Sequence, residues 1–235
     1  MANGVGGVRD MLSVSDGAAH QGHAARGTIA ARRGSRSKRL IDVTVSILAL
    51  IFLAPALALI AIALVIVDGR PIIFRQARVG AQGKMFECLK FRTMRRDAAE
   101  RLAELLATDP ERNREWMEKR KLVGDPRVHW LGKILRMTCL DELPQFYNVL
   151  RGDMSLVGPR PISLEETERY GPNLHYYTAL KPGITGMWQV KRRPETTYDE
   201  RVQLDIDYYQ SRSIYLDIVI IVKTVGVVLF ATNEI

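Results

Sequence analysis

Cysteine is scarce in this chain: Cys88 and Cys139 are the only two in 235 residues, and they show no CxxC or Cys/His spacing. Disulfide frameworks and zinc sites need such spacings, so the sequence indicates neither. So few thiols fit a reducing, cytosolic compartment. Histidine is also rare, and because the pair His20 and His23 has no third ligand beside it, we expect no metal site there.

Apolar periodicity is missing from residues 1–37, which are rich in Gly, Ala, Ser and Arg. This composition predicts a disordered basic tail. We expect no signal peptide, because the apolar segment begins late and no small-residue cleavage site follows it. The net charge of +8 favours anionic partners. Because no helix-turn-helix or interleaved aromatic and basic face is present, we expect phosphate ligands and an anionic membrane surface, and no nucleic acid.

Charge is absent from the 25 residues Val43–Val67. A helix of this length measures about 37 Å, against a hydrocarbon core of about 30 Å. Both flanks are rich in Lys and Arg, which favours a cytoplasmic position for both ends. Pro55 lies at the midpoint, where it kinks a helix. We therefore predict a re-entrant membrane helix over residues 38–70, broken at Pro55. A kinked full span is the alternative, and a buried core helix is disfavoured by the uniform apolarity.

A β-hairpin is predicted for Pro71–Met94, with its turn at Gly80–Gly83. Its alternation places Lys84, Lys90 and Arg92 on one face. Three cations on one face can clamp phosphates, but a solvated edge strand shows the same pattern. Both interpretations remain open at this stage.

The rest of the soluble part, residues 71–235, predicts a small and mostly helical α/β (α+β) domain. Asp97–Lys121 has the period of two short amphipathic helices, interrupted at Asp109 and Pro110. Ile214–Phe230 is apolar but contains charges, which predicts an amphipathic helix lying on the membrane surface. A helix packed on the domain core would show a similar sequence.

The acidic pair Asp141 and Glu142 lies in the phrase MTCLDELPQFYNVL. Because Pro144 is tolerated only in a first turn and Thr138 is a capping residue type, we place both acids in the N-terminal turn of a helix. Free N–H groups there favour phosphate, but they also favour acidic side chains with no function. Adjacent helical residues diverge by about 100°, so the two carboxylates should have different roles.

Two stiff turns follow. Arg160 lies between Pro159 and Pro161, which fix the backbone around a guanidinium suited to bidentate phosphate binding, although a surface turn would look the same. The turn Lys181–Gly186 leads to Trp188, which either stacks on a base or is buried.

Six ordered phrases carry a resemblance: KRLIDVTVS, FRQARVG, LKFRTM, LDELPQFYNVLRGDMSLVGPRP, KPGITGMWQV and LDIDYY. Over about residues 38 to 230 the chain resembles the bacterial sugar transferase family. These are monotopic phosphoglycosyl transferases that start the assembly of exopolysaccharide, O-antigen and glycoprotein glycans.

The resemblance implies a reaction, a location and a set of site residues. A sugar 1-phosphate would pass from a UDP-sugar to undecaprenyl (polyprenyl) phosphate, with release of UMP and a phosphosugar-aspartyl intermediate. The catalytic domain would face the cytoplasm at the bacterial inner membrane. The family's catalytic dyad falls on Asp141 and Glu142, which would also hold the Mg²⁺ on which the family depends. Its basic positions fall on Lys90, Arg136, Arg160 and Arg193.

Further partners implied are membrane lipids, a second copy of the chain in a homodimer, and downstream glycosyltransferases. A non-catalytic membrane scaffold for polysaccharide assembly is the alternative function.

The chain departs from the family's pattern at a few positions. Cys139 stands where the family usually has a serine, but no histidine base is nearby in the sequence to form a thiolate. KRRPET departs from the family's pattern after WQV and leaves the sugar open. We expect structural roles for His129 and Trp130.

Overall fold

The computed structural model describes residues 24–119, 122–191, 193 and 195–230. Residues 1–23 of the predicted tail lie outside this part of the chain. The other residues predicted as tail, 24–37, form the beginning of a long helix, α2 (Ala24–Asp68). Alanine and arginine are among the best helix formers, and this explains why the helix starts before the apolar run.

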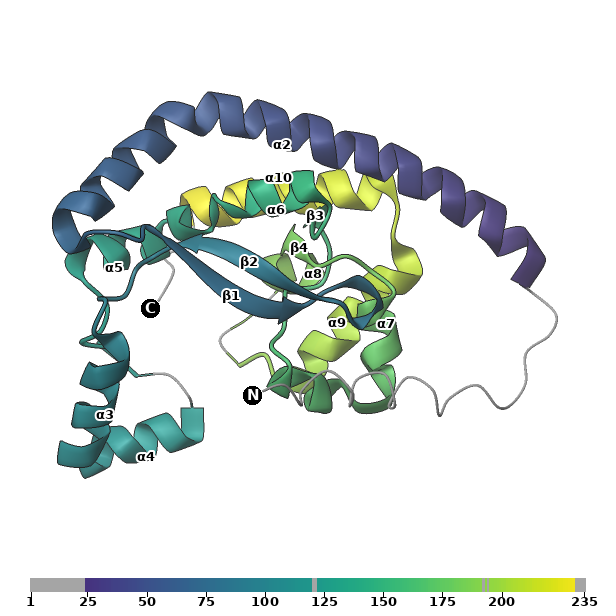
Figure 1. The fold of residues 1–235 in the computed structure, drawn as a ribbon. Coiled ribbons are helices and arrows are strands. Elements are labelled where there is room, and N and C mark those ends of the chain that lie inside the picture. Colours follow the sequence, from purple (N-terminus) through teal and green to yellow (C-terminus); the bar gives the residue numbers. More distant parts are fainter. Residues whose placement is uncertain (1–23, 120–121, 192, 194, 231–235) are drawn as a thin grey trace.

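Helix α2 arches over the rest of the domain (Figure 1). Pro55 lies inside it, and the helix continues through this residue. The predicted break is therefore a proline within one continuous, bent helix. Proline removes only one helical hydrogen bond, and the residues on either side are strong helix formers.

The first arm of α2 is attached to the domain by three polar side chains. Lys38 Nζ forms an ion pair with Asp217 at 2.6 Å, and Arg39 donates to the carbonyl oxygens of Val149 and Leu150, near the end of α6, at 2.5 and 2.7 Å. Asp42, which is 4% exposed, accepts a 3.1 Å hydrogen bond from the Ser155 hydroxyl. We expected Lys38 and Arg39 only as flanking cations, but they make specific contacts with the domain.

The second arm is attached by an apolar contact and an ion pair. Leu64 is 2% exposed and packs with Phe91 and Leu135. Arg92 pairs with Asp68 at 2.8 Å, at the C-terminal end of α2. Both arms therefore lie against the same body. Between them the apolar side chains are largely exposed, and these are Leu48, Ile51, Phe52, Leu59, Ile62 and Ile66.

By length and composition, Arg36–Asp68 could cross a membrane, and 6% of its most apolar stretch is buried. A core helix of a soluble protein would be mostly buried. The exposure of this helix, together with its composition, indicates a membrane-associated segment.

The predicted hairpin is confirmed. Strands β1 (Ile73–Val79) and β2 (Met85–Phe91) pair antiparallel, with Ile73 opposite Phe91, around a turn that contains η1 (Ala81–Gly83). Of the three cations placed on one face, Lys90 lines a pocket, Arg92 holds the end of α2 and Lys84 is exposed.

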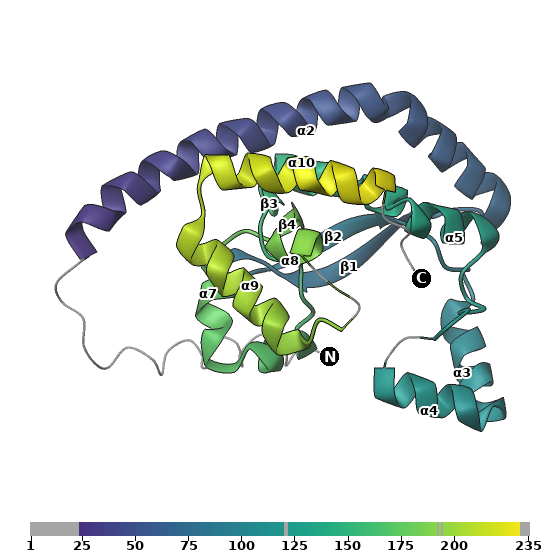
Figure 2. The ribbon, with the colours of Figure 1, turned by 180° about the vertical axis from the view of Figure 1, so that it is seen from behind.

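The two helices predicted after the hairpin are also confirmed, as α3 (Ala98–Thr108) and α4 (Pro110–Lys119). They pack on each other and project away from the body (Figures 1 and 2). The chain leaves and rejoins the body at one point, where Met94 forms an antiparallel bridge with Val128 and the Arg95 N–H donates to the Arg127 carbonyl at 2.8 Å.

The remaining elements follow in the order α5 (Trp130–Met137), η2 (Leu140–Glu142), α6 (Gln145–Arg151), β3 (Ser155–Val157), η3 (Glu165–Asn173), α7 (Leu174–Thr178), β4 (Gly183–Thr185), α8 (Met187–Lys191), α9 (Tyr198–Ser211) and α10 (Ile214–Phe230). Strands β3 and β4 form a two-stranded parallel sheet that we did not predict. A Cβ on Gly183 would lie 2.1 Å from the Gly158 nitrogen, so glycine allows the two backbones to approach.

Helix α10 runs beneath α2 (Figure 2). Its two faces combine the two alternatives that its sequence left open, a helix packed on the core and an amphipathic helix at the membrane surface. One face packs on the core through Ile220, which is 2% exposed. The opposite face leaves Tyr215 and Val222 exposed by 77% and 65%. The helix therefore packs on the domain and presents an apolar stripe outward, as an interface helix would.

We predict that Gly132→Ala destabilises the fold and that Gly226→Ala does not, although both glycines are helical. A Cβ on Gly132 would lie 2.1 Å from the Thr93 carbonyl oxygen, whereas a Cβ on Gly226 meets nothing within 4 Å. Gly132→Ala should lower the free energy of unfolding by about 1–3 kcal/mol, because the backbone must shift. Gly226→Ala should leave it unchanged or raise it by up to about 1 kcal/mol. Thermal unfolding in detergent measures both, and equal melting temperatures would contradict the close contact at Gly132.

Candidate active site

The acidic pair lies in a turn between two helices. Helix α5 ends at Met137, and its C-cap residue Thr138 donates a hydrogen bond from its hydroxyl to the Ile134 carbonyl at 2.8 Å. Cys139 then adopts a left-handed conformation with φ of 56°, and the 3-10 turn η2 carries both acids into α6. Both acids therefore lie in the first turn of a helical segment, as predicted, but this segment is the 3-10 turn η2, and α6 itself begins only at Gln145. Thr138 caps the preceding helix, because the left-handed residue ends that helix before a new one can begin.

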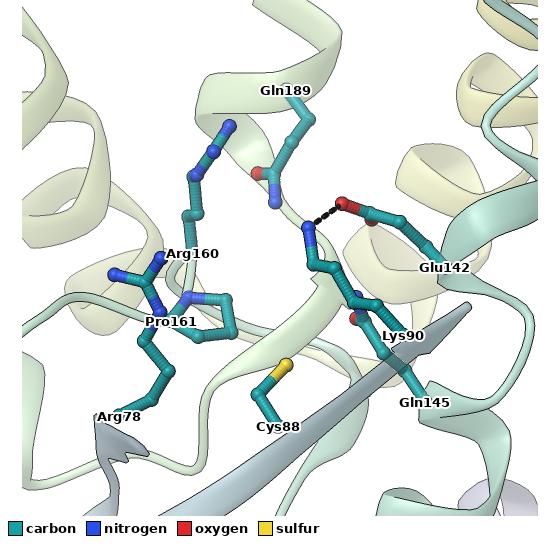
Figure 3. Close-up of a pocket in the computed structure, with 8 residues that line it drawn as sticks. All are labelled: Arg78, Cys88, Lys90, Glu142, Gln145, Arg160, Pro161 and Gln189. Atoms are coloured by element: carbon teal, nitrogen blue, oxygen red, sulfur yellow. Dashed lines mark hydrogen bonds and ion pairs between the residues drawn. The ribbon is translucent and has the colours of Figure 1, made fainter. Parts of the chain in front are cut away.

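A pocket opens beside this turn, between β2, η2 and the start of α8 (Figure 3). Lys90 Nζ and Glu142 Oε1 form an ion pair at 2.6 Å across it. The side chains that line the pocket are Arg78, Cys88, Lys90, Glu142, Gln145, Arg160, Pro161 and Gln189. Cations and hydrogen-bond donors dominate this lining, which suits a phosphate-bearing ligand.

Asp141 is 9% exposed and lies next to this ion pair in the chain. Burial, reinforced by the charge of Glu142, raises its pKa to about 6, while Lys90 and Arg136 act in the opposite direction. Arg136 is held in place by a 2.8 Å hydrogen bond from its Nε to the Thr93 hydroxyl. Asp141 is thus a poorly solvated carboxylate that is still mostly ionised at neutral pH.

Glu142 has the opposite electrostatic character. Burial would raise its pKa, but the charge and hydrogen bond of Lys90, with smaller contributions from Arg160 and Gln145, hold the pKa below its ordinary value. Two adjacent carboxyl groups whose environments separate their pKa values are suited to different roles.

Arg160 lines the pocket on the side opposite the Lys90–Glu142 ion pair (Figure 3). Burial lowers the pKa of its guanidinium, which Glu142 partly offsets. Its guanidinium carbon lies 5.6 Å from the ring centre of Trp188, and that of Arg201 lies 5.2 Å from the same ring. Trp188 is half-buried between two arginines, so its ring orders cations within the protein.

The structure brings together most of the site residues predicted from the sequence. Lys90, Glu142 and Arg160 line one pocket, and Asp141 and Arg136 lie beside it. Arg193 does not line it: this residue is exposed in the loop between α8 and α9.

Sequence reasoning missed four pocket residues, which are Arg78, Cys88, Gln145 and Gln189. Arg78, Gln145 and Gln189 lie inside phrases that carried the family resemblance, and Cys88 directly precedes one, so this was the available signal. Cys88 is no nucleophile, because burial raises the pKa of its thiol to about 11.

The described residues contain no cluster of three or more His, Cys, Asp or Glu side chains that could hold a metal by themselves. Mg²⁺ commonly binds through one or two carboxylates and completes its coordination with substrate phosphates and water. The adjacent carboxylates Asp141 and Glu142 fit that mode of binding. They would bind Mg²⁺ together with a phosphate ligand, although Glu142 already has Lys90 as a partner.

Comparison with known proteins identifies the context of this site. "Undecaprenyl-phosphate galactose phosphotransferase" of Salmonella typhimurium is 48% identical over 200 residues, which cover 85% of this chain and 42% of that protein. "Exopolysaccharide production protein ExoY" of Sinorhizobium fredii is 43% identical over 195 residues, covering 83% and 86%. "UDP-glucose:undecaprenyl-phosphate glucose-1-phosphate transferase" of Caulobacter vibrioides is 38% identical over 206 residues, covering 83% and 71%.

The chain spans about two fifths of the length of several of its curated relatives, including an "Uncharacterized sugar transferase" of Haemophilus influenzae that is 48% identical. Residues 33–231 match the family described as "Bacterial sugar transferase". That match includes the whole pocket, the acidic turn and most of α2, and the chain therefore belongs to the bacterial sugar transferase family.

Proposed function

We propose that this chain transfers a sugar 1-phosphate from a UDP-sugar to undecaprenyl phosphate and releases UMP. The observation that carries the proposal is a buried carboxylate, Asp141, beside a pocket lined by Lys90 and Arg160. The names of the relatives supply the lipid acceptor and suggest galactose or glucose as the sugar. The product would be an undecaprenyl-diphospho-sugar, the first membrane-bound intermediate of polysaccharide assembly.

The first step is attack by an Asp141 carboxylate oxygen on the β-phosphorus of the UDP-sugar. The bond from this phosphorus to the bridging oxygen breaks, and UMP leaves with the electron pair. The sugar phosphate remains on Asp141 as an acyl phosphate. Because Asp141 is poorly solvated yet ionised at neutral pH, it loses little hydration on attack.

A carboxylate approaches a diphosphate only when the negative charge is neutralised. Lys90 and Arg160 lie at the pocket, and Arg136 lies near Asp141, so three cations surround the reacting group. Mg²⁺, held by Asp141 and Glu142 together with the diphosphate, would supply further charge neutralisation. Glu142 retains its ion pair with Lys90 and keeps this ammonium group at the pocket.

In the second step, a phosphate oxygen of undecaprenyl phosphate attacks the same phosphorus. The bond to Asp141 breaks, and the carboxylate is restored. The two half-reactions share one site, so the order of events is ping-pong. The acceptor would reach the site from the lipid side, where α2 and α10 expose apolar side chains.

We also propose that α2 is re-entrant and that both of its arms remain on the cytoplasmic side. The support is that both arms make polar contacts with one domain: Lys38 with Asp217 on the first arm, and Asp68 with Arg92 at the second. A straight span would carry one of these contacts to the opposite side of the membrane. The domain would then lie against the cytoplasmic leaflet of the bacterial inner membrane.

Asp141→Asn should lower UMP release by at least about a thousandfold, because an amide is no nucleophile. Membrane association should be unchanged, since the ion pairs that hold α2 on the domain, Lys38 with Asp217 and Asp68 with Arg92, do not involve Asp141. The measurement is UMP release from UDP-galactose and UDP-glucose in the presence of undecaprenyl phosphate, with sedimentation to follow the membrane fraction. Turnover within tenfold of the wild type would contradict the nucleophile assignment and favour the scaffold alternative.

Cys139→Ser is the matched variant in the same turn. The serine should adopt the same backbone conformation as Cys139, and UMP release should remain within about threefold of the wild type. Loss of turnover in this variant, with retained fold, would point to the thiol as nucleophile instead.

The position of α2 can be tested with impermeant maleimide labelling of Arg36→Cys, at the start of the apolar segment, and of Glu104→Cys, on α3. Both side chains are exposed. Both cysteines should react in inverted inner-membrane vesicles and stay unlabelled in intact spheroplasts. The unsubstituted chain gives the background of Cys88 and Cys139. Labelling of Arg36→Cys from the periplasmic side would rule out the re-entrant arrangement.

A further inference from the structure

A single carboxylate, that of Glu166, joins two arginines at the pocket. Glu166 Oε2 accepts from Arg78 at 3.2 Å, and Oε1 accepts from Arg201 at 3.2 Å. Arg78 lines the pocket, whereas Arg201 lies behind it and is 7% exposed. The carboxylate therefore connects a group that can touch a ligand with one that is buried.

The direction of this carboxylate is fixed by the local backbone. Glu166 Oε2 also accepts from the Ser163 N–H at 2.8 Å, and the Ser163 hydroxyl accepts from the Glu166 N–H at 3.3 Å. This reciprocal pair is a capping box, formed by the sequence SLEE. It begins two residues after Pro161, so the turn that carries Arg160 and the carboxylate that holds Arg78 belong to one rigid segment.

Arg201 is held by rings as well as by Glu166. Its guanidinium carbon lies 5.2 Å from the ring centre of Trp188 and 5.0 Å from that of Tyr198. Trp188 contacts Arg160 in turn, at 5.6 Å. Among the described residues, Nε and one terminal nitrogen of Arg201 have no hydrogen-bond partner. The ion pair with Glu166 is therefore the main polar contact that fixes Arg201.

Three guanidinium groups, those of Arg78, Arg160 and Arg201, are thus gathered at one side of the pocket, and they repel one another. Glu166 is the carboxylate that pairs with two of them. If Glu166 lost its charge, Arg78 would lose its ion pair. Repulsion by the other two guanidinium groups would then favour a rotamer of Arg78 that points to solvent. The pocket would then lose one of its phosphate-binding donors.

We propose that Glu166 is a positioning residue that holds Arg78 at the pocket wall for contact with the diphosphate of the nucleotide-sugar. Arg201 and Trp188 complete the support behind it. This inference rests on the proposed function and deepens it, because it assigns Arg78 to the binding of the substrate. It predicts that loss of the Glu166 charge weakens substrate binding and leaves the chemical step intact.

The test compares Glu166→Gln with Ser163→Ala. Glutamine can keep the capping box, because its amide oxygen still accepts from the Ser163 N–H, but it loses the charge. Glu166→Gln should raise KM for the UDP-sugar about tenfold and change kcat less than threefold. Ser163→Ala removes the hydroxyl half of the box and keeps both ion pairs, so KM should stay within twofold. Thermal unfolding of both variants reports the structural cost separately.

Arg78→Gln and the double variant Arg78→Gln/Glu166→Gln complete a cycle. If Glu166 acts through Arg78, the double variant should show the same KM as Arg78→Gln alone. An unchanged KM in Glu166→Gln, or a fall confined to kcat, would overturn the inference. If Glu166→Gln does not fold, Arg78→Gln provides the test of substrate binding by Arg78, because Arg201 keeps its ion pair with Glu166 in that variant. An unchanged KM there also overturns the inference.

Calorimetric binding of UDP to the same variants separates this inference from the proposed function. If the wild-type chain releases no UMP, the reaction is wrong, but weaker UDP binding by Glu166→Gln would still support the positioning role. If the wild type turns over and UDP binding is equal in the wild type and Glu166→Gln, the positioning role alone is wrong.

Discussion

The attachment of both arms of α2 to one domain is the constraint on which the rest of the structure depends. On the first arm, Lys38 and Asp42 reach Asp217 and Ser155, which lie far along the chain. On the second, Asp68 meets Arg92 at the end of the hairpin. These contacts are partly shielded from water, so removal of one partner leaves a poorly solvated charge or acceptor at a cost of about 1–3 kcal/mol. The arch therefore keeps its shape, and the pocket keeps its place beside the apolar surface.

The pocket combines two carboxylates of different character within one short turn. The left-handed Cys139 ends α5 early, and the acids follow before α6 begins, so neither lies in a regular helix. Asp141 turns into poorly solvated surroundings, while Glu142 reaches Lys90. This geometry separates the two carboxylates, which supports the different roles that we propose for them.

Much of the architecture was predictable from local signals. The hairpin, the helix pair around Asp109 and Pro110, and the amphipathic C-terminal helix all follow from periodicity and turn residues. The β3 and β4 pair was not predictable, because three-residue strands carry no period and their pairing depends on a close approach of Gly158 and Gly183. The site divides in the same way. Lys90, Arg78 and Arg160 all belong to recognisable phrases, but the contact that holds Arg78 at the pocket comes from Glu166, a partner distant in the sequence.

The point where the α3 and α4 pair joins the body has a consequence for engineering. The bridge between Met94 and Val128 joins the two ends of the segment that contains α3 and α4, so the length of this segment has little effect on the pocket. In chain-entropy terms, doubling a loop closed in this way costs only about 0.6 kcal/mol. The junction of the two helices at Asp109 and Pro110 is therefore a natural insertion point for a fluorescent or affinity module, which would project away from α2 and α10.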